Sequence, residues 1–341
     1  MIRSLVLTPN ADASADVVSE EAPVNAMILL RNLTQENLEI RLSEGCTMWL
    51  DIVTPEEKEI HWLERLLQLS PNVVSDLLRE DRRPTLLVYP RYLFLSLFQP
   101  YAHPNGLVSK EIHCIIGDHF YVTVRQADAN ALEEAYNRVS QNPDSWQRGV
   151  AYFLYITAQH IIDTYYPLLD RISNQLNGLE EKLMTNGADV QAQKSVYRVK
   201  QHLIGLRQMI APQREVLSNL IGEQRISTNE DTRDLFRHLY ERLLGIYDVI
   251  DSQRDLTNSV MEIIGTQEAR KTGEAVSRLT IFSMVFLPFT FFVGLFQLNF
   301  VTIAEPMILP INGLVMLITV ALLMIASGAA MLIFFRRRGW V

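Results

Sequence analysis

The segment LTIFSMVFLPFTFFVGLFQLNFVTIA, residues 279–304, contains no charged side chain and decides the fold class of this chain. Glu305 follows it, and residues 306–335 form a second uncharged stretch. Each stretch exceeds the roughly 20 apolar residues that a helix needs to cross a bilayer core. Two buried helices of a soluble core are the alternative, but such helices seldom stay apolar on every face over this length. The sequence therefore predicts two membrane-spanning helices, at 279–297 and 307–335.

Basic residues predict the orientation of these spans. Three arginines at 336–338 follow the second span, and Arg270, Lys271 and Arg278 precede the first. The connecting loop, 298–306, contains no Lys or Arg. The positive-inside rule then places both termini in the cytoplasm and the loop outside, as expected for a multi-pass protein of the cell inner membrane. The start of the chain has no apolar region long enough for a secretory signal.

Charge and cysteine content exclude several classes of protein. Three of the 31 Lys and Arg and one of the 39 Asp and Glu lie after Arg278, so the part up to Arg278 has a net formal charge of −10. Such a domain repels nucleic acid and attracts cations, although a merely soluble acidic surface explains the charge equally well. Cys46 and Cys114 are the only cysteines, which argues against a disulfide framework and a thiolate metal site.

The chain changes character several times along its length. Short runs rich in Val, Ile, Phe and Tyr, such as TMWLDIV and FYVTVR, predict strands in the first third, and long helical patterns follow. We therefore expect an α+β cytoplasmic domain with a long stalk helix and two transmembrane helices. The predicted parts are a flexible tail (1–24), an α/β domain (25–126), helical arms (127–227), a stalk helix (228–278), the two spans with their loop, and a basic tail (336–341).

The stalk is predicted to continue into the first span. No proline occurs between about Glu230 and Pro288. A helix from there to Phe296 would be on the order of 100 Å long at 1.5 Å per residue. A monomer of this size cannot bury such a helix, so we expect a symmetric ring of copies of the chain.

One face of this helix carries small and weakly polar residues. Spaced three, four or seven apart, the residues of this face are Glu262, Ala269, Gly273, Val276, Thr280, Ser283, Leu287, Thr290 and Gly294. Close packing between helices is one interpretation of the stripe. A pore lining is the other, with Leu287 and Leu279 as apolar constrictions and Ser283 and Thr290 as hydroxyl rings. The stripe alone does not choose between them.

Asn299, at the end of the first span, favours the pore. A ring of Asn side chains offers neutral oxygens that bind the water shell of a divalent cation without stripping it, which suits Mg²⁺ because Mg²⁺ dehydrates reluctantly. Glu305 would concentrate cations at the entrance. A polar cap at a helix end is the ordinary alternative for Asn299.

The words LTIFSMVFLPFTFFVGLFQLNF, FFRRRGW, MWLDI and YLFLSLF together resemble the CorA-type divalent cation transporters, a two-span family with a Gly-x-Asn signature. The resemblance covers nearly the whole chain, and GLF is closer to the zinc-transporting ZntB-like branch. It implies a funnel-shaped homopentamer whose first span lines the pore for Zn²⁺, Mg²⁺, Co²⁺ or Ni²⁺. The matching motif implies that Asn299 lies in the selectivity ring, together with Gln297 and Leu298. It places Thr290 and Leu287 further down the pore. Glu262 matches an acidic position below the membrane.

Three departures from the family pattern affect the predicted sites. Gln297 replaces the signature glycine, so Gly-x-Asn becomes Gln-Leu-Asn, and Gly273 replaces a pore asparagine. His238 stands where some relatives carry a regulatory aspartate. Imidazole suits Zn²⁺, Ni²⁺ or Co²⁺, so His238 with Glu241 is a candidate regulatory metal site, and a solvent-facing helix residue is the alternative.

The leading hypothesis is a passive or gated divalent cation transporter that uses no cofactor and binds only itself, lipid and divalent cations. A non-conducting membrane-anchored sensor or scaffold is the alternative, favoured by Gln297 and Gly273. No HExxH motif or Gly-rich phosphate loop appears, so we do not expect an enzyme. Glu57 and His61 also have a metal-capable helical spacing, for which surface pairing is the simpler explanation.

Overall fold

The computed structural model describes residues 1–9, 27–79, 84–103, 106–186, 189–227, 230–297 and 313–337. The chain divides into two compact units, Met1–Met261 and Glu262–Val341. The division falls inside one helix, α10 (Glu230–Gln297), so this helix contributes to both units. The expected combination of an α+β unit with a long helix is confirmed.

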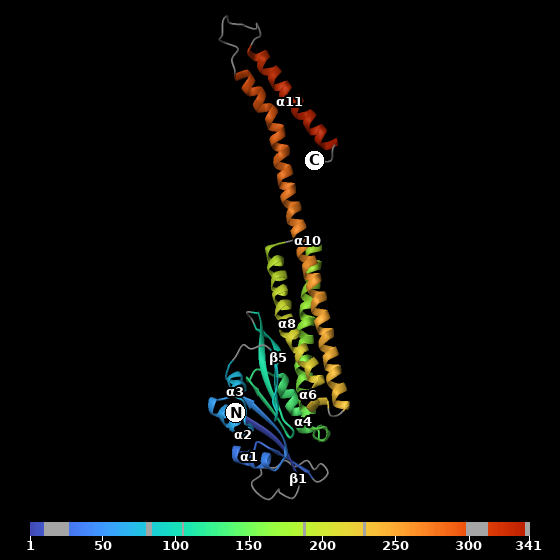
Figure 1. Ribbon diagram of the computed structural model, residues 1–341. Helices are drawn as coiled ribbons and strands as arrows, with labels where there is room; N and C mark the ends of the chain where they lie inside the picture. Colours follow the sequence, from blue (N-terminus) through green and yellow to red (C-terminus); the bar gives the residue numbers. More distant parts are fainter. Residues whose placement is uncertain are drawn as a thin grey trace. The chain divides into compact units, whose positions relative to one another are not determined.

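A seven-stranded sheet organises the first unit (Figure 1), and its spatial order is β2-β1-β3-β7-β6-β5-β4. Every neighbouring pair is antiparallel except β3 and β7, which are parallel. The strands are β1 (Ile2–Pro9), β2 (Met27–Arg31), β3 (Thr47–Val53), β4 (Leu86–Val88), β5 (Leu93–His103), β6 (Gly106–Ile116) and β7 (Phe120–Arg125). Each strand segment predicted from sequence corresponds to one of these.

Helices cover both faces of the sheet, which explains why its central strands are apolar on both sides. One core holds residues of α1 (Gln35–Ser43), α2 (Glu57–Leu67) and α3 (Pro71–Leu78). The other core holds residues of α4 (Ala131–Gln141), α5 (Asp144–Gln147), α6 (Val150–Asp163), α7 (Tyr165–Asn186), α8 (Val190–Gly222), α9 (Gln224–Ser227) and the first part of α10. Figure 1 shows α1 to α3 on one side of the sheet and α4, α6 and α8 on the other.

The prediction of a flexible tail at 1–24 is wrong for the start of the chain. Residues Ile2–Pro9 form β1, which lies inside the sheet between β2 and β3. Leu5 and Val6 are adjacent in sequence and both fully buried, because the two faces of the sheet are both covered. The small polar residues that follow hid this short apolar run in the composition. Residues 10–26 lie outside the described residues.

The second unit contains the end of α10 and α11 (Gly313–Arg337). Among the described residues, one helix, within Glu230–Phe291, is long and apolar enough to cross a membrane, and its apolar window is not buried. A Cβ atom added at Gly328 of α11 would lie 3.3 Å from Cζ of Phe289, so glycine lets this aromatic ring approach. The predicted domain boundaries beyond residue 126 stay predictions.

Candidate functional site

The predicted pore stripe lies on a single helix. All seven pore-lining candidates, Glu262, Gly273, Val276, Leu279, Ser283, Leu287 and Thr290, belong to α10. At 3.6 residues per turn they fall within an arc of about 120°. The continuous helix therefore brings them to one face in the order the sequence predicts.

Exposure in the single chain does not distinguish this face from the others. Leu287 is 71% exposed and Leu279 66% exposed, and the off-stripe residue Phe282 is 60% exposed. Apolar side chains at this density need a cover of lipid or of other chains. The exposed surface is thus consistent with both interpretations of the stripe, and copies of the chain are needed to enclose a path.

Hydrogen bonds within α10 define what its hydroxyl groups offer. The Thr290 hydroxyl donates to the carbonyls of Leu287 (2.9 Å) and Phe286 (3.2 Å), and the Thr280 hydroxyl donates to the carbonyl of Val276 (2.8 Å). A hydroxyl has one proton and two lone pairs, so its oxygen keeps the capacity to accept. An oxygen of this kind can accept a hydrogen bond from a water molecule of a hydrated cation.

Pro288 adds an acceptor to the same segment. Proline has no N–H group, so α10 loses the hydrogen bond that residue 288 would donate to the carbonyl of Met284. The helix nevertheless continues through Pro288 to Gln297. A freed carbonyl at membrane depth is tolerated where it faces protein or water.

The predicted filter lies at and beyond the end of α10. Gln297 is the last residue of the helix. Leu298, Asn299 and Glu305 lie outside the described residues. Their roles in the selectivity ring and at the entrance stay predictions.

His238 and Glu241 both lie on α10 with exposed side chains. His238 lines a hollow with Asp231, Asp234 and Arg148, and Glu241 is not part of that lining. Among the described residues, no three His, Cys, Asp or Glu side chains are grouped to hold a metal ion. The cation of Arg148 also opposes metal binding there. A regulatory site built on His238 therefore needs ligands from outside this group.

The Glu57 and His61 pair is a surface cluster. His61 Nδ1 lies 3.0 Å from Glu64 Oε2, and its Nε2 lies 3.8 Å from Glu57 Oε1. The His61 side chain is 53% exposed. Exposed pairs of this kind contribute little to stability.

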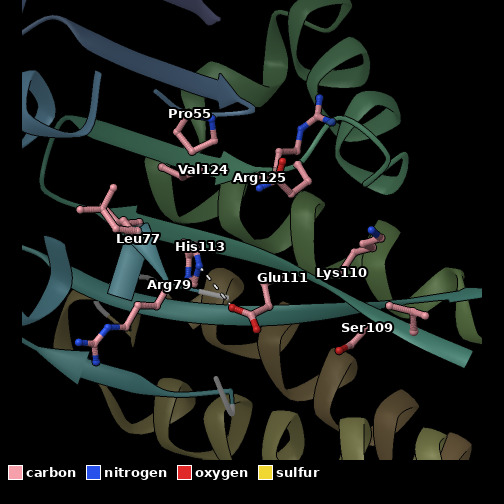
Figure 2. A pocket seen from close by; sticks show the side chains of 12 residues that line it. Pro55, Leu77, Arg79, Ser109, Lys110, Glu111, His113, Val124 and Arg125 are labelled. Atoms are coloured by element: carbon pink, nitrogen blue, oxygen red, sulfur yellow. Dashed lines mark ion pairs between the residues drawn. The ribbon is translucent and has the colours of Figure 1, made fainter. Parts of the chain in front are cut away.

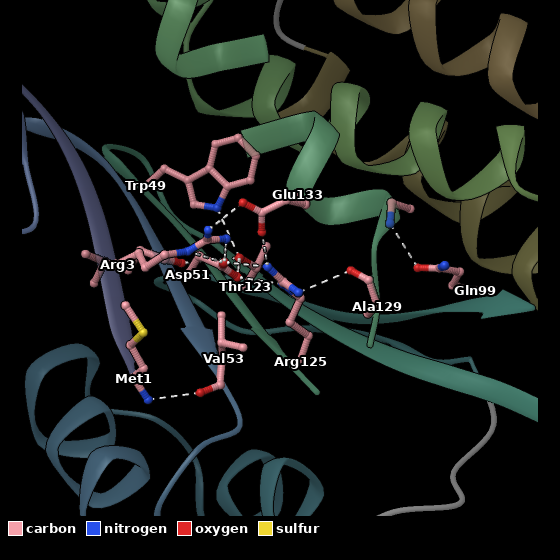
Figure 3. Close-up of polar contacts among 12 residues, drawn as sticks. Met1, Arg3, Trp49, Asp51, Val53, Gln99, Thr123, Arg125, Ala129 and Glu133 are labelled. Carbon is pink, nitrogen blue, oxygen red and sulfur yellow. Dashed lines mark hydrogen bonds and ion pairs between the residues drawn. The ribbon is translucent and has the colours of Figure 1, made fainter. Parts of the chain in front are cut away.

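Sequence reasoning missed a buried charge cluster centred on Asp51 of β3 (Figure 3). The fully buried carboxylate accepts hydrogen bonds from Arg3 of β1, from Arg125 Nη2 (3.1 Å) and from the Thr123 hydroxyl (2.9 Å) of β7. Glu133 of α4 pairs with both guanidinium groups, at 2.8 Å from Arg3 and 3.0 Å from Arg125. The hydrogen bond from Arg3 is the main cause that lowers the pKa of Glu133. Charged residues inside the apolar runs TMWLDIV and FYVTVR were the signal that could have revealed it.

A cavity of about 250 Å³ lies where the parallel strands β3 and β7 end (Figure 2). Most of its charged lining residues have partners nearby: Lys110 pairs with Asp128 (2.6 Å), His113 Nε2 lies 3.6 Å from Glu111, and Arg125 pairs with Asp51. Arg79 is the remaining charged residue of the lining. Leu77 and Val124 supply apolar wall. We therefore assign this cavity no ligand.

Comparisons with known proteins agree with this architecture. The family model described as "CorA-like Mg2+ transporter protein" matches residues 45–337. The putative metal ion transporter YfjQ of Bacillus subtilis is 26% identical over 92% of this chain and 95% of its own length. The cobalt/magnesium transport protein CorA of Thermotoga maritima is 24% identical over 80% of this chain and 77% of its own. The zinc transport protein ZntB of Yersinia pseudotuberculosis is 27% identical over 75% of this chain and 77% of its own.

Solved structures show the same fold. The CorA magnesium transporter of Methanocaldococcus jannaschii matches with a TM-score of 0.78 at 19% identity, covering 99% of this chain and 98% of its own. The full-length CmaX protein matches with a TM-score of 0.69 at 18% identity, covering 98% and 96%. Both matches extend over nearly the whole chain, so they include the sheet, the helical arms and the long helix.

Proposed function

The chain belongs to the family of CorA-like Mg²⁺ transporter proteins, and from this membership we propose that it is a divalent metal cation transporter of the cell inner membrane. Relatives named for cobalt and magnesium transport and for zinc transport match at similar identity, which supports the cation class rather than one ion. We propose a homopentamer with two spans per chain and with both termini in the cytoplasm. Zn²⁺, Mg²⁺, Co²⁺ and Ni²⁺ are the candidate cargo.

The uninterrupted α10 is the observation that carries the proposal. It is 68 residues long, about 100 Å at 1.5 Å per residue, and it runs from a charged segment into an uncharged one. Its stripe of small, hydroxylated and apolar residues is exposed in the single chain. Two spans per chain cannot enclose water, whereas several copies of one face around an axis can.

The proposed path has three chemical zones. At the outer mouth, Glu305 concentrates cations and Asn299, with Gln297 and Leu298 beside it, binds their water shells. In the bilayer, Thr290 and Ser283 offer hydroxyl oxygens, and Leu287 forms an apolar constriction that gates by excluding water.

Toward the cytoplasm the stripe continues through Leu279, Val276 and Gly273 to Glu262. A Cβ atom added at Gly273 would meet no atom within 4 Å, so packing within the chain does not require glycine there. We propose Gly273 as a flexible point of the helix, since glycine lowers helix stability relative to alanine. A membrane potential of −100 mV would add about 4–5 kcal/mol to the inward movement of each divalent ion.

Metal uptake into liposomes tests the proposal. The purified full chain is reconstituted with a metal-sensitive dye inside, and Zn²⁺, Mg²⁺, Co²⁺ and Ni²⁺ are added outside. We expect saturable flux that Asn299→Ala abolishes and that Phe282→Leu, an off-stripe control on the same helix, leaves unchanged. Absence of flux from an assembled oligomer, restored by Gln297→Gly, would refute conduction by the natural chain and favour the sensor.

A further inference from the structure

A groove of about 390 Å³ lies between α7 and α8, outside the proposed pore and far along the chain from its filter. Side chains from both helices converge on it. Its polar lining includes Asn174, Gln175 and Lys182 from α7, and Ser195, Arg198 and His202 from α8. On α8 these residues are spaced three and four apart, and on α7 Asn174 and Gln175 lie about two turns before Lys182, so each set occupies one helical face.

The groove is cationic although the chain as a whole has a net charge of −8. Lys182 and Arg198 supply its positive charge, and no Asp or Glu is among its lining residues. His202 also lines it, and burial together with the nearby Arg198 lowers the pKa of this imidazole. Among the described residues, none of these three has a salt bridge, whereas Arg207 and Arg242 elsewhere in this unit each pair with an aspartate. Lys182 and Arg198 also lack an acidic residue four positions away on their own helices. The groove therefore concentrates positive charge that the chain does not neutralise.

Gly178 of α7 forms part of the groove, and a Cβ atom added there would meet nothing within 4 Å. Glycine in a helix interior is less stable than alanine, and here no neighbouring atom requires it. A missing side chain beside open space allows a ligand to approach the helix backbone closely. Gly178 thus leaves open space in the groove, next to the helix backbone.

We propose that the groove between α7 and α8 binds a phosphate-bearing anion. Arg198 presents a planar fork that matches phosphate oxygens, and Lys182 supplies a compact charge from the opposite helix. His202 and the amides of Asn174 and Gln175 supply further donors. The volume suits a diphosphate or a phosphate ester, and the same chemistry is presented by an anionic lipid headgroup.

Binding of inorganic pyrophosphate to the purified full chain tests the site. Isothermal titration calorimetry is performed in detergent at 150 mM salt without divalent metal, so that distant surface charges are screened. We expect Arg198→Gln and Lys182→Gln each to weaken binding about tenfold, because each removes a charge-assisted contact. Gly178→Leu should abolish binding by filling the groove without changing any charge.

Lys200→Gln is the matched control, because Lys200 lies on α8 outside the groove and contacts Met261 Sδ at 3.9 Å. It should bind pyrophosphate as the natural chain does. Equal weakening in Lys200→Gln and Arg198→Gln, or undiminished binding to Gly178→Leu, would overturn the proposal. So would absence of binding to the natural chain at millimolar pyrophosphate.

Nanodiscs distinguish the two sources of phosphate. If the ligand is a soluble phosphate ester, pyrophosphate should bind equally in nanodiscs of neutral and of anionic lipid. If it is a headgroup, anionic lipid should compete and reduce pyrophosphate binding in the natural chain. If anionic lipid reduces pyrophosphate binding in Arg198→Gln as strongly as in the natural chain, the lipid headgroup is not the source of the phosphate.

Discussion

Replacing Asp51 with asparagine should destabilise the α+β unit more than any other single change of charge in it. The substitution keeps the shape of the side chain and removes the charge that compensates Arg125, which is 2% exposed. Removing one partner of a buried ion pair typically costs 3–5 kcal/mol. Glu133 still pairs with Arg125 at 3.0 Å, so we expect the lower end, about 3 kcal/mol.

Urea unfolding of the full chain in detergent, followed by tryptophan fluorescence, measures this effect. Trp49, Trp62 and Trp146 are all buried in the first unit. Trp49 Nε1 donates a hydrogen bond to the Thr123 hydroxyl (3.1 Å), and this hydroxyl donates to Asp51 (2.9 Å). The fluorescence therefore reports unfolding of the region that the substitution perturbs.

Glu133→Gln is the matched control, since it removes a carboxylate from the same cluster. The Glu133 side chain is 47% exposed. Water solvates the exposed end of this ion pair and weakens it, so we expect Glu133→Gln to lower the free energy of unfolding by less than about 1 kcal/mol. If Asp51→Asn lowers the free energy of unfolding by no more than Glu133→Gln does, burial of the Asp51 carboxylate does not determine the strength of this cluster. A double variant Asp51→Leu with Arg125→Met should recover much of the loss, because it removes both buried charges.

Three further results are expected. Tyr165→Phe should lower the free energy of unfolding by about 1–3 kcal/mol in the same urea assay, because the buried hydroxyl accepts from Gln213 Nε2 (2.6 Å) and donates to a backbone carbonyl (3.0 Å). Leu287→Ser should raise basal divalent flux into liposomes by removing an apolar constriction, and the off-stripe Phe282→Ser should not. The pKa of Glu133 is held below its ordinary 4.5, so its stabilisation is complete above pH 4.5 and is lost as the pH falls through the folded value. Thermal unfolding midpoints of Glu133→Gln should accordingly fall less steeply below pH 4.5 than those of the natural chain.

The strands after residue 26 and the long helix were predictable from local patterns, and the motifs of the chain indicated the family by resemblance. An uncharged run long enough to span a bilayer is a property of consecutive residues, and so is the β-branched and aromatic content of TMWLDIV and FYVTVR. The stripe on α10 was predictable for the same reason, because a continuous helix places residues on a face by spacing alone. The proposed filter at Asn299 would require several chains to meet at an axis, so residue spacing could only identify Asn299 as a candidate.

The first strand shows where local patterns stop being informative. Ile2–Pro9 is a short apolar run followed by small polar residues, and its composition predicted a loose tail. Its place between β2 and β3 depends on partner strands that begin at residues 27 and 47. Pairing with distant strands, rather than the propensity of eight residues, makes this segment part of the core.

The sequence by itself determined most of the elements and the kind of membrane protein this is, because hydrophobic length, helical period and charge asymmetry are properties of neighbouring residues. Only the tertiary structure decided that Arg3, Asp51, Arg125 and Glu133 form one cluster, since they come from β1, β3, β7 and α4. It likewise joined α7 and α8 into a cationic groove. Charges far apart along a chain interact only when the fold brings them within a few ångströms and removes the water between them.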